Sequence, residues 1–235
     1  MAAKSIRTPS LKHTCMAGLQ AMILSGQYKI GQKLPPEREL AATLGVSRPV
    51  VHQALVELAS QGLVRIAPRK GVTVNDFRVA GSSAILTQLL SYGEGELEPA
   101  FLGSMLAVRR LIETDVARLA AANCSAEQLA QLGEIVDQEL ENDRSDLGEL
   151  AELDFAFHQL IALSSGNMVY PLILNSFKAA HTNITRKLFA RHPGQPVLDQ
   201  VFDYHRRILV AIAAHDSEAA ATIMDEMLHH ATINL

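Results

Sequence analysis

Residues 31–64 read GQKLPPERELAATLGVSRPVVHQALVELASQGLV, and this stretch decides the fold of the N-terminal third of the chain. Two adjacent prolines exclude a helix before Glu37, and the apolar residues after them predict a short helix that Gly45 ends. Ser47 is a candidate N-cap for a second helix, which Gly62 stops. Two helices joined by so short a turn favour a helix-turn-helix.

The sequence on either side of this pair completes a small domain. Residues 10–25 carry apolar side chains at a helical period, so a further helix is expected there. Downstream, LVRIA at 63–67 and VTVND at 72–76 are β-prone and flank PRKG, which predicts a hairpin with a basic tip. The order of these elements is that of a winged helix-turn-helix, expected over residues 1–76.

Several polar side chains of this domain are candidates for contacts with DNA. An α-helix fits the major groove, and Arg48 on the second helix of the pair could bind guanine through two hydrogen bonds. Arg38 could hold a phosphate, while the hairpin tip would lie along the backbone or in the minor groove. The plainer interpretation is that both arginines are solvated helix residues. The predicted contacts are Arg38, Ser47, Arg48, Pro49, His52, Arg69, Lys70 and Gly71.

The charge of the chain is divided between its two ends. Residues 1–78 carry 11 Lys and Arg against 4 Asp and Glu, a net charge of +7, whereas the remaining residues have a net charge of −11. A basic end beside an acidic one favours two domains, of which the first faces a polyanion. Small basic domains without such a partner are also common.

Composition narrows the class of protein. A chain of 235 residues without Trp and with 5% aromatic residues favours helices over a β-sandwich. Neither an apolar run long enough to span a membrane nor an apolar N-terminal leader is present, so no membrane partner is expected. Cys15 and Cys124 are far apart and are interpreted as buried thiols of a reducing compartment. We therefore expect a cytoplasmic protein.

The C-terminal two thirds are predicted to be entirely helical. A linker is expected over 77–83, followed by a domain over 84–235 in which long amphipathic helices and short connections indicate an antiparallel bundle. The whole chain is therefore expected to be mainly α. The expected helices cover residues 84–92, 97–122, 126–142, 146–164, 168–191, 199–214 and 217–232.

A possible metal site lies inside the predicted bundle. Asp154 and His158 are spaced i, i+4, so both project from one face of a helix, and His205 lies on a later helix. Carboxylate and imidazole ligands suit a divalent ion such as Zn, Ni or Mn. The plainer interpretation is that each histidine is hydrogen-bonded in the core. A metal-dependent enzyme is a further alternative, but no motif such as H-E-x-x-H supplies its general base.

The chain also resembles a known family. Residues 31–64, with RKGVTV at 69–74, resemble the N-terminal signature of the GntR family of bacterial transcription regulators. This resemblance implies a dimeric repressor or activator whose Arg38, Arg48 and Gly71 contact operator DNA. The fatty-acid-responsive, FadR-type branch often has a second arginine where this chain has His52, so the operator sequence cannot be carried over.

The second half resembles the FCD ligand-sensing domain of the same branch. The motifs that carry this resemblance are VRRLIE at 108–113, DFAFH at 154–158, YHRRIL at 204–209 and AHDSEAA at 214–220. The resemblance implies an Asp-His-His-His metal set whose last histidine lies in the final helix. Counting on from His205 brings that position to Met227, and a thioether is a poor ligand for such ions. His230 could substitute, or the site could have three ligands or be a metal-free pocket, as in acyl-CoA-responsive relatives.

Arg109 is the candidate counter-charge for an effector. A guanidinium facing a bound metal could bind a carboxylate through two hydrogen bonds, and a pair with Glu113 in the same helix is the alternative. The sequence thus predicts a homodimeric, ligand-responsive transcription regulator rather than an enzyme, with an organic or sugar acid as effector. A purely structural metal site and a metal-free acyl-CoA sensor remain open alternatives.

Overall fold

The computed structural model describes residues 10–81, 85, 99–142, 144–191 and 196–235. Two compact units divide the chain, one over residues 1–93 and the other over 94–235. The helix expected over 84–92 lies outside the described residues except for Ile85.

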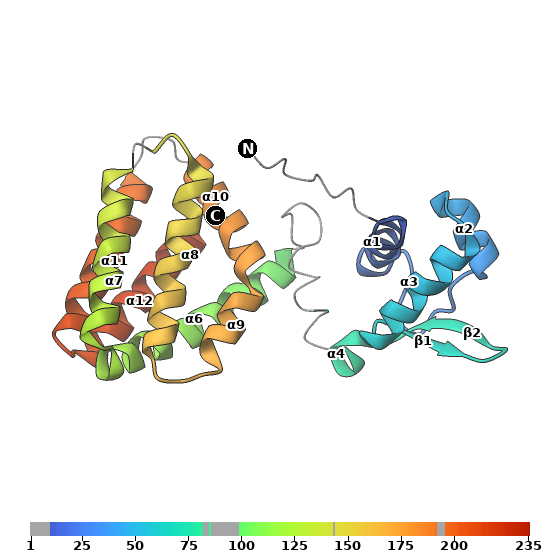
Figure 1. Ribbon diagram of the computed structural model, residues 1–235, viewed down its shortest axis with the longest axis horizontal. Coiled ribbons are helices and arrows are strands. Elements are labelled where there is room, and N and C mark those ends of the chain that lie inside the picture. The colour runs from blue at the N-terminus through green and yellow to red at the C-terminus, as the bar shows by residue number, and fades with distance from the viewer. Residues whose placement is uncertain (1–9, 82–84, 86–98, 143, 192–195) are drawn as a thin grey trace, which may run out of the picture. The chain divides into compact units, whose positions relative to one another are not determined.

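The N-terminal unit is a winged helix-turn-helix, as the sequence predicts (Figure 1). Its two strands form an antiparallel hairpin in which Val64 pairs with Val74 and Ala67 with Gly71. Its elements are α1 (Leu11–Leu24), α2 (Glu37–Leu44), α3 (Arg48–Ser60), β1 (Val64–Ala67), β2 (Gly71–Val74) and α4 (Phe77–Ala80).

Local sequence explains where the helices of this unit begin and end. Pro36 precedes α2 as its N-cap, and Gly45 ends α2 with a φ of +65°, a left-handed conformation that glycine adopts without strain. The apolar faces of α1, α2 and α3 then close over the hairpin in one core. Its fully buried large side chains are Leu19, Leu40, Leu55, Leu58 and Leu63.

The segment expected to be a linker takes part in this unit. Residues 77–80 form the single turn of α4, capped by the side chain of Asp76. Ile85, beyond the expected linker, is buried in the core of the N-terminal unit. The packed structure of the first unit therefore extends past residue 76.

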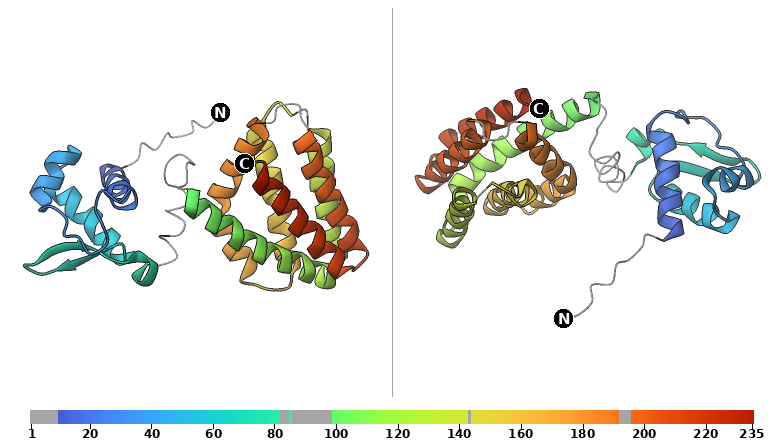
Figure 2. Two further views of the ribbon diagram at one scale, coloured as in Figure 1. Left: turned by 180° about the vertical axis from the view of Figure 1, so that it is seen from behind. Right: turned by 90° about the horizontal axis from the view of Figure 1, so that it is seen from above.

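The C-terminal unit is a helical bundle, and the mainly helical fold class is confirmed. Helix α8 packs against α6, α7, α9 and α10, while α6 and α12 run side by side (Figure 2). Its helices are α6 (Pro99–Asn123), α7 (Ala126–Glu141), α8 (Leu147–Ser164), α9 (Tyr170–Ser176), α10 (Lys178–Arg191), α11 (Pro196–Ala213) and α12 (Ser217–Ile233).

One helix expected from the sequence is divided in two. The prediction of a continuous helix over 168–191 is wrong, because α9 ends at Ser176 and α10 begins at Lys178. The hydroxyl of Ser176 donates to the carbonyl of Ile173 at 2.6 Å, a bond that competes with the helical backbone pattern. In the part of the chain described, no helix combines the length and apolar character needed to cross a membrane.

Candidate DNA-binding surface and buried polar cluster

The N-terminal unit brings most of the predicted DNA-contacting residues to one groove. This groove has a volume of about 550 Å³ and lies between the start of α2, the start of α3 and the hairpin. Ser47, Pro49 and His52 are exposed at the beginning of α3. The predicted residues that line the groove are Arg38, Arg48, Arg69, Lys70 and Gly71.

The hairpin tip depends on backbone conformations with positive φ. Arg69 has a φ of +61° and Gly71 one of +95°. A Cβ atom added at Gly71 would lie 2.8 Å from Cε of Lys33, too close for a real contact. The end of the flexible Lys33 side chain could move aside, so it is the positive φ that favours glycine at position 71.

Glu37 organises the exposed polar side chains of α3, a role that the sequence did not reveal. Nε of Arg48 donates to one oxygen of its carboxylate at 3.1 Å, and Nδ1 of His52 lies 2.7 Å from the other. The hydrogen bond from His52 and the one from Arg48 outweigh partial burial and lower the pKa of Glu37. The i, i+4 spacing of Arg48 and His52 was a usable signal, because it puts both on one face.

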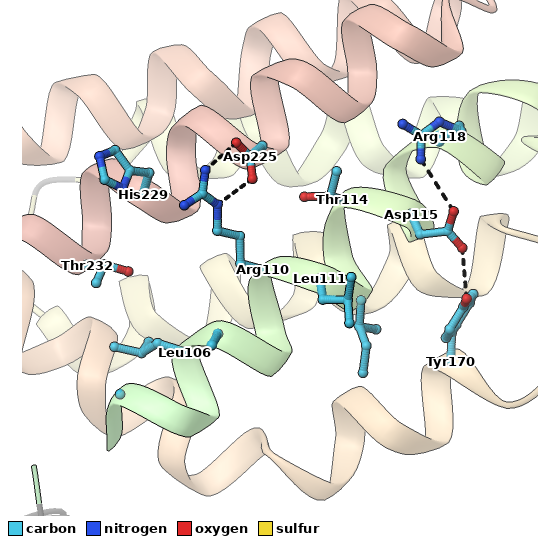
Figure 3. Close-up of a pocket in the computed structure, with 13 residues that line it drawn as sticks. Leu106, Arg110, Leu111, Thr114, Asp115, Arg118, Tyr170, Asp225, His229 and Thr232 are labelled. Carbon is cyan, nitrogen blue, oxygen red and sulfur yellow. Dashed lines mark hydrogen bonds and ion pairs between the residues drawn. The ribbon is translucent and has the colours of Figure 1, made fainter. Parts of the chain in front are cut away.

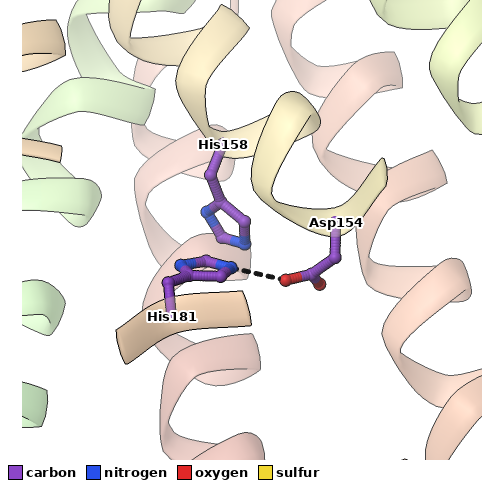
Figure 4. Close-up of side chains that lie close together, drawn as sticks. All are labelled: Asp154, His158 and His181. Atoms are coloured by element: carbon purple, nitrogen blue, oxygen red, sulfur yellow. Dashed lines mark hydrogen bonds and ion pairs between the residues drawn. The ribbon is translucent and has the colours of Figure 1, made fainter. Parts of the chain in front are cut away.

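In the C-terminal unit, a compact polar cluster combines residues from α8 and α10. Asp154 and His158 project from α8 toward His181 on α10 (Figure 4). Each of the three offers a ligand atom, and these atoms lie within 4.8 Å of one another. Nε2 of His181 lies 2.6 Å from Oδ2 of Asp154, which also accepts a hydrogen bond from the Thr185 hydroxyl at 3.1 Å.

His205, the third residue predicted for the metal, lies beside this cluster on α11. Its Nε2 is 3.6 Å from Oδ1 of Asp154, and its Nδ1 bonds to Glu139 at 2.9 Å. Both His205 and Glu139 are completely buried. Among the described residues, Nε2 of His205 has no hydrogen-bond partner, so one ring nitrogen in the interior is left facing Asp154.

His158 has a similar carboxylate behind it. Its Nδ1 lies 2.5 Å from Oε2 of Glu113, whose other oxygen accepts a hydrogen bond from Nε of Arg109 at 2.6 Å. His158 and His205 therefore each present one ring nitrogen to a buried carboxylate, which orients the ring. The Arg109–Glu113 pair is the alternative that the sequence left open for Arg109.

The protonation states follow from burial and from these partners. Burial alone would raise the pKa of Asp154, but the hydrogen bond and charge of His181 and its other histidine neighbours hold it well below its ordinary value. Burial and the charge of Arg109 lower the pKa of His181 to about 4. Burial opposes charge on His205, yet Glu139, Asp154 and Glu113 together raise its pKa.

The charges inside the bundle do not balance. Among the described residues, the buried carboxylates are Glu113, Glu139 and Asp154, and Arg109 is the buried guanidinium. A surplus of buried negative charge is costly unless protons or a cation compensate for it. Three histidines around Asp154 can therefore take up either protons or a divalent ion.

The position expected for a fourth ligand does not contribute a histidine. Met227 is buried in the hydrophobic core, and the ring of His230 packs near Tyr204 with the ring centroids 5.9 Å apart. His181 instead adds the extra imidazole next to Asp154. Arg109, Phe177 and His181 also border a cavity of about 10 Å³, which has room for about one water molecule.

A separate groove lies on the outer face of α6 and α12 (Figure 3). It has a volume of about 800 Å³ and is lined mainly by apolar atoms. Arg110 in this groove pairs with Asp225, and Arg118 pairs with Asp115, which also accepts a hydrogen bond from the Tyr170 hydroxyl at 2.8 Å. Both guanidinium groups in this groove therefore have carboxylate partners.

Comparisons with known proteins agree with both units. The model of the bacterial regulatory proteins of the gntR family matches residues 12–74, and that of the FCD domain matches residues 104–230. The transcriptional regulator Mce2R of Mycobacterium tuberculosis is 31% identical over 242 residues, which cover 100% of this chain and 95% of that protein. The fatty acid metabolism regulator protein of Escherichia coli is 32% identical over 197 residues, 83% of this chain and 78% of that protein.

Solved structures share the fold at low sequence identity. The Lar regulator, which controls expression of the agr system of Listeria monocytogenes, has a TM-score of 0.62 at 18% identity, covering 97% of both chains. McbR/YncC of E. coli has a TM-score of 0.52 at 20% identity, covering 94% of this chain and 95% of that one.

Proposed function

Because the chain belongs to the GntR family of bacterial transcription regulators and carries an FCD domain, we propose that a small metabolite controls its binding to operator DNA. The metabolite binds in the C-terminal bundle of a cytoplasmic homodimer. Its binding shifts the relative placement of two DNA-binding heads and so changes operator affinity. The matching families consist of DNA-binding regulators, and this removes the metal-dependent enzyme as a candidate.

The groove of the N-terminal unit supports the assignment of the DNA contacts. Arg48 and His52 at the start of α3 face base edges in the major groove, while Arg38 and Ser47 hold phosphates. Residues 69–71 at the hairpin tip follow the backbone into the minor groove. The proposed DNA contacts are Arg38, Ser47, Arg48, Pro49, His52, Arg69, Lys70 and Gly71.

We propose that the buried cluster holds a divalent ion, Zn, Ni or Mn. The observation that carries this proposal is the unpartnered Nε2 of His205, fully buried and 3.6 Å from Asp154. A carboxylate behind a histidine fixes one ring nitrogen and leaves the other for a metal, as Glu139 does for His205 and Glu113 for His158. The proposed ligands are Asp154, His158 and His205, joined by His181.

An organic acid is the effector class that suits this cluster. A bound ion supplies a Lewis-acid position for one oxygen of a carboxylate. Arg109 borders the adjoining cavity and supplies the positive charge for the acid, although its Nε already bonds to Glu113. Because the cavity holds about one water molecule, the bundle must open between α6 and α9 to admit an effector.

Metal analysis of the purified full-length protein tests this proposal. We expect about one equivalent of Zn, Ni or Mn, and we expect His158→Ala to lose it while DNA affinity without effector stays unchanged. Less than about a tenth of an equivalent, with no rise after Zn or Ni is added, would mean that the pocket is metal-free, as in an acyl-CoA-type sensor. Metal uptake without any response to organic acids would indicate a purely structural site.

A further inference from the structure

Two exposed side chains of α3 share one carboxylate. Arg48 is 73% exposed and His52 is 57% exposed, yet both are tied to Glu37, whose side chain is 24% exposed. Each side chain uses one nitrogen for this purpose, Nε in Arg48 and Nδ1 in His52. Within the part of the chain that the structure describes, the atoms that remain for a partner are the two terminal nitrogens of Arg48 and Nε2 of His52.

The partner of Nδ1 decides what Nε2 of His52 can do. A carboxylate only accepts hydrogen bonds, so Nδ1 of His52 carries the proton that it donates to Glu37. In the neutral ring, Nε2 is then an acceptor, and it becomes a donor only when the ring gains a second proton. The major groove presents amino donors on cytosine and adenine, and acceptors on guanine (N7 and O6), adenine (N7) and thymine (O4).

We propose that Glu37 is a positioning residue that determines which base His52 selects. With the ring neutral, Nε2 of His52 accepts a hydrogen bond from the amino group of cytosine or adenine. With the ring protonated, it donates instead to an acceptor on guanine, adenine or thymine, and cytosine no longer offers it a partner. This inference rests on the proposed contact between α3 and the major groove, and it assigns His52 a base preference that changes with pH.

Arg48 provides an internal comparison on the same helix. Its guanidinium is charged at every relevant pH, and with Nε held by Glu37 its two terminal nitrogens remain for O6 and N7 of a guanine. The preference for guanine at its base pair is therefore expected to be independent of pH. The other charged side chains that line the groove are basic as well, namely Lys33, Arg38, Arg69 and Lys70.

The test measures base preference with full-length protein. An operator is first selected from random duplexes, and every base pair is then substituted in turn, with affinities measured at about pH 8 and about pH 5.5. At one base pair we expect cytosine to be preferred over guanine by about tenfold at the higher pH, and guanine over cytosine at the lower. His52→Ala should abolish both the preference and its change.

Glu37→Ala and Glu39→Ala form a matched pair, because each removes one acidic side chain from the first turn of α2. Both should strengthen binding to unrelated DNA slightly, since less negative charge faces the phosphates. Only Glu37→Ala should reduce discrimination at the base pairs of both Arg48 and His52, by about tenfold at each. Glu39→Ala should keep the wild-type preferences.

Two results would overturn the inference. One is a base preference in His52→Ala that matches the wild type at both pH values, measured on protein whose circular dichroism spectrum shows that it is folded. The other is full discrimination at both base pairs in Glu37→Ala. If the wild type selected no sequence at all from random duplexes, the proposed function itself would fail, which is a different outcome.

Discussion

Arg48 and Lys70 are both basic and exposed, but their positions predict different contributions to DNA binding. Arg48 lies at the start of α3, where a base edge is in reach, whereas Lys70 lies at the hairpin tip beside the backbone. Arg48→Ala should therefore weaken the free energy of operator binding by about 1–3 kcal/mol and reduce the base preference at one base pair. Lys70→Ala should weaken binding to all DNA sequences alike. It should also reduce the slope of log affinity against log salt concentration by about one.

Gel shifts over a salt series, with the operator and its single-pair variants, separate these two effects. An Arg48→Ala protein that kept its affinity and its sequence preference would show that α3 is not the recognition helix.

Glu37 should make the stability of the N-terminal unit depend on pH. Its pKa is lowered chiefly by the hydrogen bond from His52, so its contribution to stability is present above its ordinary pKa and is lost as the pH falls through the lowered value. In His52→Ala the pKa of Glu37 should rise, and the loss should begin at a higher pH. A ¹³C NMR titration of the Glu37 carboxyl in both proteins measures this difference; equal values would contradict it.

Single residues also show how far the sequence could be interpreted. The i, i+4 rule placed Asp154 and His158 together, and the structure confirms that they share one face of α8. His181 could not be placed, because its direction depends on the packing of α10 and not on local spacing. The contacts of Glu113 with His158 and of Glu139 with His205 were missed for the same reason, since each joins helices far apart in the sequence.

At the level of elements, two N-cap serines differ in what their side chains do. Ser125 and Gln128 form a capping box at the start of α7, whereas Ser47 makes no side-chain cap bond at the start of α3. Ser125→Ala should therefore lower the free energy of unfolding by about 1 kcal/mol, and Ser47→Ala by much less. Chemical denaturation of the two variants checks this order.

Ser47→Ala should instead weaken DNA binding, because its hydroxyl remains available for a phosphate. A loss of stability as large as that of Ser125→Ala would show that Ser47 caps α3 after all.

The break between α9 and α10 could not be predicted from the periodicity of the apolar residues. Apolar residues recur at helical spacing through residues 168–191, and neither Gly nor Pro interrupts them near Phe177. A helix with a single-residue interruption produces nearly the same pattern as a continuous one. Element existence was therefore predicted well, whereas this internal boundary required the packing of the bundle.

At the level of the whole molecule, the two units should be separable. Because α4 and Ile85 belong with the first core, a fragment of residues 1–93 should fold, whereas one ending at residue 76 should be less stable. Without the C-terminal unit the longer fragment should be monomeric and should bind an operator far more weakly than the full chain, since two linked heads bind cooperatively. Circular dichroism and gel shifts test both parts. Operator affinity equal to that of the full chain would contradict the role of the second unit.

The last prediction concerns the interface of the proposed homodimer. A palindromic operator requires two heads, and the outer face of α6 and α12 offers an apolar groove beside Leu111, which is 75% exposed. If this face joins two copies, Leu111→Glu buries a charge in the interface and should give monomers that bind the operator weakly. Leu163→Glu, an equal change at a 52% exposed position on α8, is the control and should leave the dimer intact. Light scattering at micromolar concentration measures the oligomeric state of both variants. A Leu111→Glu protein that stayed dimeric would place the interface elsewhere. A wild-type protein that was monomeric, with or without DNA, would exclude the dimer.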